Sequence, residues 1–164
     1  KDLNYVYKRE DFIFNYGIFK LLKKADELGF LIIIITNQSG IGRGLYTKGQ
    51  FLELMDWVKK KFLMYNIPIK KIYFCPHHPI HGKGKYKKNC QCRKPRPLLF
   101  NKAKNEFNID MSQSIMIGDK KSDLEAAYSA GVQNLILVSK SKNFYNEKYL
   151  KYNSILDIYR NFLM

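Results

Sequence analysis

The sequence has no long hydrophobic run and no secretion signal. Its longest unbroken apolar stretch, Phe30 to Ile35, is far shorter than the roughly 20 residues that a membrane-spanning helix needs. The first residues, Lys-Asp-Leu-Asn-Tyr, lack the apolar segment of a signal peptide. Because 46% of the 164 residues are hydrophobic and 15% are aromatic, we predict a folded, soluble, cytoplasmic protein without a membrane partner.

Acidic residues are also scarce. The chain has 14 of them against 29 lysines and arginines, which gives a net charge of +15. The stretch from Lys83 to Lys104 contains many cations and no carboxylate. Such a stretch favours binding of a polyanion, either a nucleic acid or a multiply phosphorylated small molecule. A solvated basic surface with no partner is an equally good interpretation, and composition alone leaves both open.

Helical and strand patterns alternate along the chain. Strands are expected at residues 30–35, 71–74, 114–117 and 134–138, and helices at 14–28, 47–65, 97–107, 122–130 and, more weakly, 155–162. Thr47 with Gln50, and Ser122 with Glu125, fit helix-capping boxes. This order predicts an α/β fold with a doubly wound, Rossmann-like and mainly parallel sheet. We expect one domain over residues 1–164, with residues 75–93 as an inserted loop. Because the chain starts with a helix, we also expect an N-terminal strand to be missing.

Polar residues follow two of the expected strands, where phosphate sites lie in open α/β sheets. Thr36, Asn37 and Gln38 follow the first strand, and a hydroxyl with backbone amides there suits phosphoryl oxygens. Asp119 follows the strand that ends at Gly118, and a carboxylate at that place suits Mg²⁺. The plainer alternatives are an Asx turn at the first position and a helix-capping carboxylate at the second.

Two cations stand between the cysteines and the prolines that follow them. Lys94 can neutralise charge on a transferring phosphoryl group, and Arg93 can bind a second anionic group through two hydrogen bonds. Two solvated side chains in a basic stretch are the alternative. Pro95 and Pro97 indicate a rigid backbone, which favours the functional interpretation.

The cysteines form part of a metal-ligand pattern. Cys75-x-His77 and Cys90-x-Cys92 offer four ligands for a closed, structural zinc site. Free thiols with a surface histidine are the alternative. His78 and His81 are spare candidates, which we rank below His77.

Because of these residues together, the chain resembles the phosphatases of the haloacid dehalogenase (HAD) superfamily. Within them it is most similar to the D-glycero-D-manno-heptose 1,7-bisphosphate phosphatases, which form a histidinol-phosphate phosphatase-like subgroup with a zinc loop. The shared motifs are Thr-Asn-Gln-Ser-Gly-Ile-x-Arg-Gly at 36–44, Cys-Pro-His-His-Pro at 75–79, Cys-x-Cys-Arg-Lys-Pro at 90–95 and Gly-Asp-Lys-x-x-Asp at 118–123. The resemblance covers nearly the whole chain up to about residue 139.

The resemblance implies a role for each matching residue. Thr36 and Lys94 would act in catalysis, Asp119 would bind Mg²⁺ with support from Asp123, and Cys75, His77, Cys90 and Cys92 would bind structural Zn²⁺. The implied substrate contacts are Asp2, Leu3, Asn4, Tyr5, Thr36, Asn37, Gln38, Ser39, Arg93, Lys94 and Lys120. The implied activity is a magnesium-dependent phosphomonoester hydrolase of carbohydrate metabolism. The enzyme, expected to be a monomer, would convert the bisphosphate to the heptose 1-phosphate, which supplies lipopolysaccharide or S-layer precursors.

One family motif does not occur in the sequence. HAD phosphatases attack phosphorus with the first aspartate of an Asp-x-Asp motif and use the second as acid and base. No Asp-x-Asp occurs in the 164 residues. We therefore expect the nucleophile upstream of residue 1, and we expect these residues alone to be inactive.

Three other functions stay open from the sequence. A histidinol-phosphate phosphatase would share the zinc loop, although Ser39-Gly40-Ile41 favours the heptose group. A polynucleotide 3′-phosphatase would suit the charge, but the cysteine-rich loop argues against it and against nucleic acid as a partner. A catalytically inactive, zinc-bearing binding module is the third.

Overall fold

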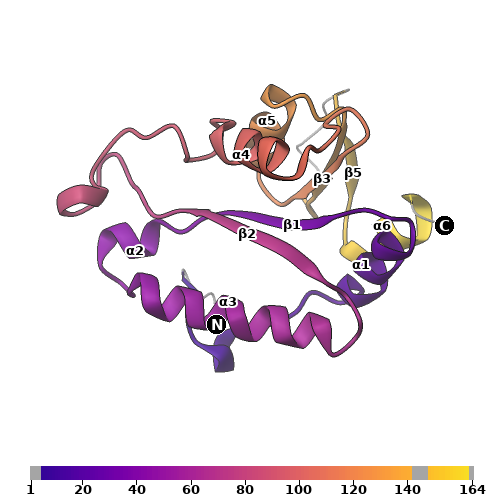
Figure 1. Ribbon diagram of the computed structural model, residues 1–164, viewed down its shortest axis with the longest axis horizontal. Coiled ribbons are helices and arrows are strands. Elements are labelled where there is room, and N and C mark those ends of the chain that lie inside the picture. The colour runs from indigo at the N-terminus through magenta and orange to yellow at the C-terminus, as the bar shows by residue number, and fades with distance from the viewer. Residues whose placement is uncertain (1–4, 142–147, 163–164) are drawn as a thin grey trace. The chain divides into compact units, whose positions relative to one another are not determined.

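The computed structural model describes residues 5–141 and 148–162 (Figure 1). The chain divides into two compact units, one ending at Cys90 and the other beginning at Gln91. Every strand pairing within each unit is parallel. The α/β class with parallel strands is thereby confirmed.

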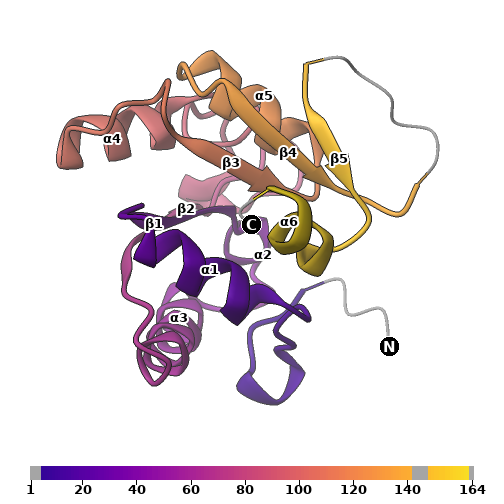
Figure 2. The ribbon, with the colours of Figure 1, turned by 90° about the vertical axis from the view of Figure 1, so that its right-hand side faces the viewer.

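The first unit is built on two parallel strands, β1 (Ile32–Asn37) and β2 (Ile69–Cys75), with Asn37 opposite Cys75. Its helices are α1 (Ile18–Glu27), α2 (Ser39–Arg43) and α3 (Lys48–Leu63), with single 3₁₀ turns η1 (Arg9–Asp11) and η2 (Gly84–Tyr86). Figure 2 shows α1 and α3 on the same side of the strand pair. This layering follows from the β-branched run of β1 and the apolar faces of the two helices.

The core of the first unit forms along α3. Phe51, Leu54, Met55, Val58 and Phe62 recur at helical spacing and are all buried. The helix begins as the sequence predicts, because the Thr47 hydroxyl accepts from the Gln50 N–H and the Gln50 side chain accepts from the Thr47 N–H. The capping box at Thr47 is therefore confirmed.

The second unit has three parallel strands in the order β3 (Ile115–Gly118), β4 (Asn134–Val138) and β5 (Leu150–Tyr152). Its helices are α4 (Leu98–Phe107), α5 (Lys121–Ser129) and α6 (Ile155–Phe162). Figure 2 shows the strands side by side with α5 behind them. Leu135, Ile136 and Leu137 of β4 are buried, as expected for a central strand covered on both faces.

Two local predictions were wrong, and one strand was missed. The first long helix begins at Ile18, because Gly17 has a left-handed φ of 89° that separates Phe14 from the helix. Phe14 still packs edge-on against Phe62, 5.3 Å between ring centroids. The predicted capping box of Ser122 with Glu125 does not form, since α5 begins earlier. Strand β5 was not predicted, because three residues give too short a pattern.

Candidate functional site

The polar residues singled out in the first unit follow β1 at its carboxyl end. Thr36 and Asn37 are its last two residues, Gln38 comes next, and Ser39 begins α2. All four side chains are half-buried. The Gln38 amide donates to the Thr36 hydroxyl through Nε2, at 3.0 Å. The predicted phosphate-binding hydroxyl is therefore held by a neighbour rather than left to rotate.

Tyr46 extends this contact into the core. Its hydroxyl donates to Oε1 of Gln38 in a short hydrogen bond. The Tyr46 ring is 4% exposed and stacks on Tyr7, with centroids 5.2 Å apart and planes at 9°. Burial and, to a smaller extent, the neighbouring Tyr5 raise the pKa of Tyr46 to about 12. The hydroxyl therefore stays protonated at physiological pH and remains a hydrogen-bond donor.

The segment 38–44 is braced by the loop that follows β2. The Gln38 N–H donates to the Cys75 carbonyl at 2.7 Å, and the Lys83 N–H donates to the Gly42 carbonyl at 2.7 Å. A Cβ at Gly42 would overlap the carbonyl oxygen of Pro76, so only glycine permits this approach. The predicted phosphate-binding segment and the cysteine-rich loop thus support each other.

Arg43 reaches the predicted sugar-contacting segment. Its Nη1 donates to the Tyr5 hydroxyl at 2.7 Å, and its guanidinium lies 5.6 Å from the centroid of the same ring. Tyr5 is the first residue that the structure describes. The other predicted members of the segment, Asp2, Leu3 and Asn4, lie outside the described residues.

The second unit contains a buried ion pair between two predicted site residues. The Lys94 Nζ lies 2.8 Å from Oδ1 of Asp123, and the two side chains are 7% and 8% exposed. The other carboxylate oxygen of Asp123 accepts from the Lys120 N–H at 3.2 Å. Asp123 therefore both caps the start of α5 and fixes the ammonium of Lys94.

Asp119 lies at the carboxyl end of β3 and is exposed, as is Lys120. Arg93 is half-buried beside Lys94. Gly118 leaves no room for a side chain, because a Cβ there would lie 2.7 Å from the Cβ of Asp123. Of the two predicted magnesium-binding carboxylates, Asp119 is the accessible one. One open carboxylate fits Mg²⁺, which commonly takes its remaining ligands from water and substrate phosphate.

The four predicted zinc ligands come together. The ligand atoms of Cys75, His77, Cys90 and Cys92 all lie within 4.8 Å of one another. The Cys75 Sγ lies 3.5 Å from the Cys90 Sγ and 3.6 Å from the His77 Nδ1. Tetrahedral bonds of about 2.3 Å would separate two sulfurs by about 3.8 Å. The group is thus compatible with zinc, and His78 and His81 are not part of it.

The environment of His77 favours the neutral imidazole that a metal needs. Burial, followed by the positive charge of Lys88, lowers the pKa of His77. The ring centroids of His78 and His81 instead lie 4.9 Å apart. The His78 Nδ1 accepts hydrogen bonds from the backbone N–H groups of Ile80 and His81. That acceptor role removes the Nδ1 lone pair from metal binding.

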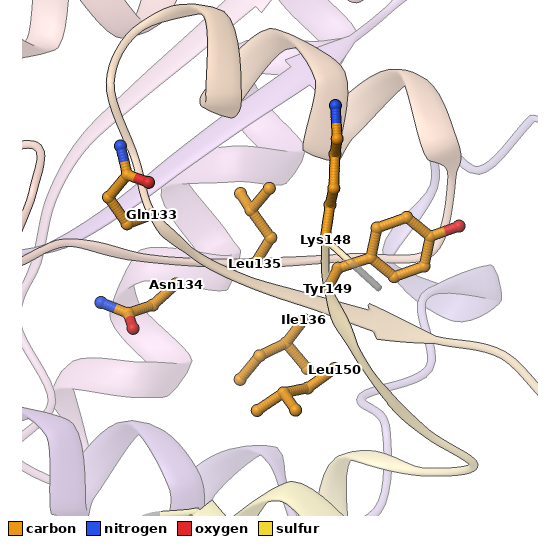
Figure 3. Close-up of a pocket in the computed structure, with 7 residues that line it drawn as sticks. All are labelled: Gln133, Asn134, Leu135, Ile136, Lys148, Tyr149 and Leu150. Carbon is orange, nitrogen blue, oxygen red and sulfur yellow. The ribbon is translucent and has the colours of Figure 1, made fainter. Parts of the chain in front are cut away.

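A pocket of about 140 Å³ occupies the other end of the second unit's sheet (Figure 3). It lies where β4 and β5 begin, whereas Asp119 lies where β3 ends. Small-molecule sites usually enclose about 300–1,000 Å³ and lie at the carboxyl ends of parallel strands. We therefore assign this pocket no part in the site. Its lining residues are Gln133, Asn134, Leu135, Ile136, Lys148, Tyr149 and Leu150.

The curated relatives give the family of the chain. It is 44% identical to a D-glycero-alpha-D-manno-heptose-1,7-bisphosphate 7-phosphatase of Burkholderia mallei, over 84% of this chain and 73% of that protein. It is 43% identical to the corresponding beta-heptose 7-phosphatase of Vibrio cholerae, over 86% of this chain and 76% of that one. This chain belongs to the heptose-1,7-bisphosphate 7-phosphatase family. The recognition of that family from the sequence motifs is confirmed.

The other comparisons agree with this family. A protein-family model described as HAD-hydrolase-like matches residues 91–151. A D,D-heptose 1,7-bisphosphate phosphatase of B. bronchiseptica, solved with magnesium and phosphate, superposes with a TM-score of 0.82 at 21% identity. The match covers 98% of this chain and 89% of that structure, and it confirms the HAD fold. As a member of the family, the chain is of the phosphomonoester hydrolase class, as predicted.

No helix among the described residues is both long enough and apolar enough to cross a bilayer. This agrees with the absence of a long apolar run in the sequence.

Sequence reasoning missed Tyr46 and the Arg43–Tyr5 contact. A signal for Tyr46 was present, because an apolar residue just before a helix cap often packs near the fourth helical position. Here Tyr46 precedes the cap Thr47, and Phe51 is that fourth position; both belong to one buried cluster. No sequence signal pointed to the Arg43–Tyr5 contact, which joins residues far apart in the chain.

Proposed function

We propose that this protein removes the 7-phosphate of D-glycero-D-manno-heptose 1,7-bisphosphate and leaves the heptose 1-phosphate. The observation that carries this proposal is the set of relatives, 39–45% identical over 84–86% of this chain and named for that activity. Relatives named for the alpha and for the beta anomer match about equally well. The proposal therefore specifies the reaction at position 7 and not the anomer.

In this proposal Thr36 donates its hydroxyl hydrogen bond to a phosphoryl oxygen. Lys94 neutralises the charge that develops on the transferring phosphoryl group. The buried carboxylate of Asp123, 2.8 Å from the Lys94 Nζ, holds that ammonium in place. Arg93 and Lys120 contribute positive charge for the second phosphate, and Asn37, Gln38, Ser39 and Tyr5 contact the substrate.

Two metal ions complete the proposal. Asp119, whose exposed side chain directly follows β3, would hold Mg²⁺, and the ion would shield phosphate charge. Cys75, His77, Cys90 and Cys92 would hold Zn²⁺ in a structural role, because four protein ligands leave no position for substrate.

The residues of this chain are assigned binding and charge stabilisation, not nucleophilic attack. The sequence has no Asp-x-Asp, so none of these residues is proposed as the attacking carboxylate. We therefore expect the 164 residues to bind the bisphosphate without turning it over. A monomeric state, a cytoplasmic location and a preference for sugar over nucleic acid stay predictions.

The test is calorimetric binding of heptose 1,7-bisphosphate to the 164-residue chain with Mg²⁺. Histidinol phosphate and a 3′-phosphorylated oligonucleotide are the competing ligands. We expect the heptose bisphosphate to bind tightest and Lys94→Met to weaken its binding by at least 10-fold. Lys102→Met removes the same charge from an exposed position on α4 and serves as control. Tighter binding of either competitor, or equal effects of the two substitutions, would overturn the proposal.

A further inference from the structure

We propose that Tyr46 is a positioning residue that sets the hydrogen-bond polarity of Thr36 through the side chain of Gln38. This inference deepens the proposed function and rests on it for the role of Thr36. Tyr46 itself would touch neither the phosphate nor the sugar.

The argument starts from the Gln38 amide. A glutamine amide has one accepting end, Oε1, and one donating end, Nε2. The Tyr46 hydroxyl donates to Oε1, and Nε2 donates to the Thr36 Oγ1 at 3.0 Å. If the amide turned over, the Tyr46 hydroxyl would face Nε2 as an acceptor and its own buried proton would lose the Oε1 acceptor. Because a phenolic hydroxyl donates more readily than it accepts, Tyr46 favours the observed orientation.

The amide orientation decides what Thr36 can offer a ligand. A threonine hydroxyl has one hydrogen to donate and two lone pairs. Since one lone pair of the Thr36 Oγ1 accepts from Gln38, its own hydrogen is left for another acceptor. A phosphoryl group presents acceptor oxygens, so this polarity matches the proposed substrate. The opposite amide orientation would draw the Thr36 hydrogen to Gln38 and turn a lone pair toward the phosphate.

The packing around Tyr46 keeps its hydroxyl in one place. A Cβ at Gly40 would overlap the Tyr46 ring, so glycine at that position makes room for the ring edge. The ring stacks on Tyr7 with planes at 9° and is tilted against Tyr5 at 6.3 Å. The raised pKa of Tyr46 keeps the donating proton on the hydroxyl at working pH.

The test compares Tyr46→Phe with Tyr7→Phe. Each change removes one phenolic hydroxyl from a stacked pair of rings and keeps the ring, so the two variants are matched in chemistry. The first readout is the ¹H–¹⁵N signal of the Gln38 side-chain amide, identified by its loss in Gln38→Leu. We expect Tyr46→Phe and Thr36→Val to shift this signal and Tyr7→Phe to leave it in place.

The second readout is the Kd for heptose 1,7-bisphosphate, with inorganic phosphate as a smaller probe. We expect Tyr46→Phe to weaken binding of both ligands about 5-fold to 10-fold, since the misdirected hydrogen bond is a charge-assisted one. In a Gln38→Leu background the same substitution should change Kd by less than 2-fold, because the connecting amide is gone. Thr36→Ser should retain binding, since it retains the hydroxyl.

Several results of these experiments would overturn the positioning role of Tyr46. An unchanged Gln38 amide signal in Tyr46→Phe, or equal Kd values for the wild type and that variant, overturns the positioning role. An additive effect in the Gln38→Leu background also overturns it, because Tyr46 would then act by another route. A wild-type chain that binds neither ligand refutes the proposed function and with it the functional half of this inference. The amide signals would still establish or refute the Tyr46–Gln38 orientation.

Discussion

The buried pair of Lys94 and Asp123 gives the sharpest stability prediction. Its atoms are 2.8 Å apart, and both side chains are less than 10% exposed. Removing one partner of a buried ion pair costs about 3–5 kcal/mol, because the other charge stays desolvated. Asp123→Ala also deletes the acceptor of the Lys120 N–H, for about 1 kcal/mol more. Each kcal/mol lowers the melting temperature of a chain this size by about 2–4 °C, so a fall of at least about 8 °C is expected.

The assay is chemical and thermal denaturation of the wild type, the Asp123 and Lys94 variants and a matched control. Asp123→Asn retains an acceptor for Lys120 and isolates the loss of charge, so it should cost less than Asp123→Ala. Glu125→Ala is the control, since Glu125 pairs with Lys121 at 3.5 Å on the same helix but both are exposed. That exposed pair should contribute no more than about 0.5 kcal/mol.

A double-mutant cycle completes the experiment. Lys94→Met combined with Asp123→Asn removes both charges, so we expect it to recover about half of the single-variant loss. If Asp123→Asn cost no more than Glu125→Ala, or if the two single losses simply added, the buried ion pair described here would be wrong.

Three further predictions concern the metal group, a glycine and a tyrosine. Cys90→Ser should lower the zinc content measured by atomic absorption from one per chain to well below one, and chelation should reduce the melting temperature of the wild type but not of this variant. Gly118→Ala should destabilise the fold by about 1–3 kcal/mol in urea denaturation, because its Cβ would meet Asp123 at 2.7 Å; an unchanged midpoint would refute this close contact. The pKa of the Tyr46 hydroxyl rises from 10.0 to about 12 on folding. The folded state should therefore lose stability as pH rises from 10 to 12, by up to about 3 kcal/mol, because the unfolded chain releases this proton first. Tyr46→Phe should lack this loss when unfolding free energies at pH 9 and pH 12 are compared, and parallel losses in the two proteins would contradict it.

The sequence alone determined those features that depend on residues close together in the chain. The Thr47–Gln50 cap spans one helical turn, and the buried β1 run is a continuous string of β-branched residues, so local patterns were sufficient. The motif at 36–44 identified the strand end and the family because it is contiguous. The grouping of Cys75, His77, Cys90 and Cys92 was also predicted from the sequence, since metal chemistry limits which side chains can serve as ligands and their short spacings are distinctive.

Only the tertiary structure decided the pairing of side chains from separate elements. The Lys94–Asp123 ion pair and the Arg43–Tyr5 hydrogen bond join distant parts of the chain, and no periodicity encodes such partners. The start of α5 also differed, because the helix begins at Lys121 and the Asp123 carboxylate, which also pairs with Lys94, accepts from the Lys120 N–H. Packing decides these cases: a buried polar group must find a partner, and which partner it finds depends on how the chain folds around it.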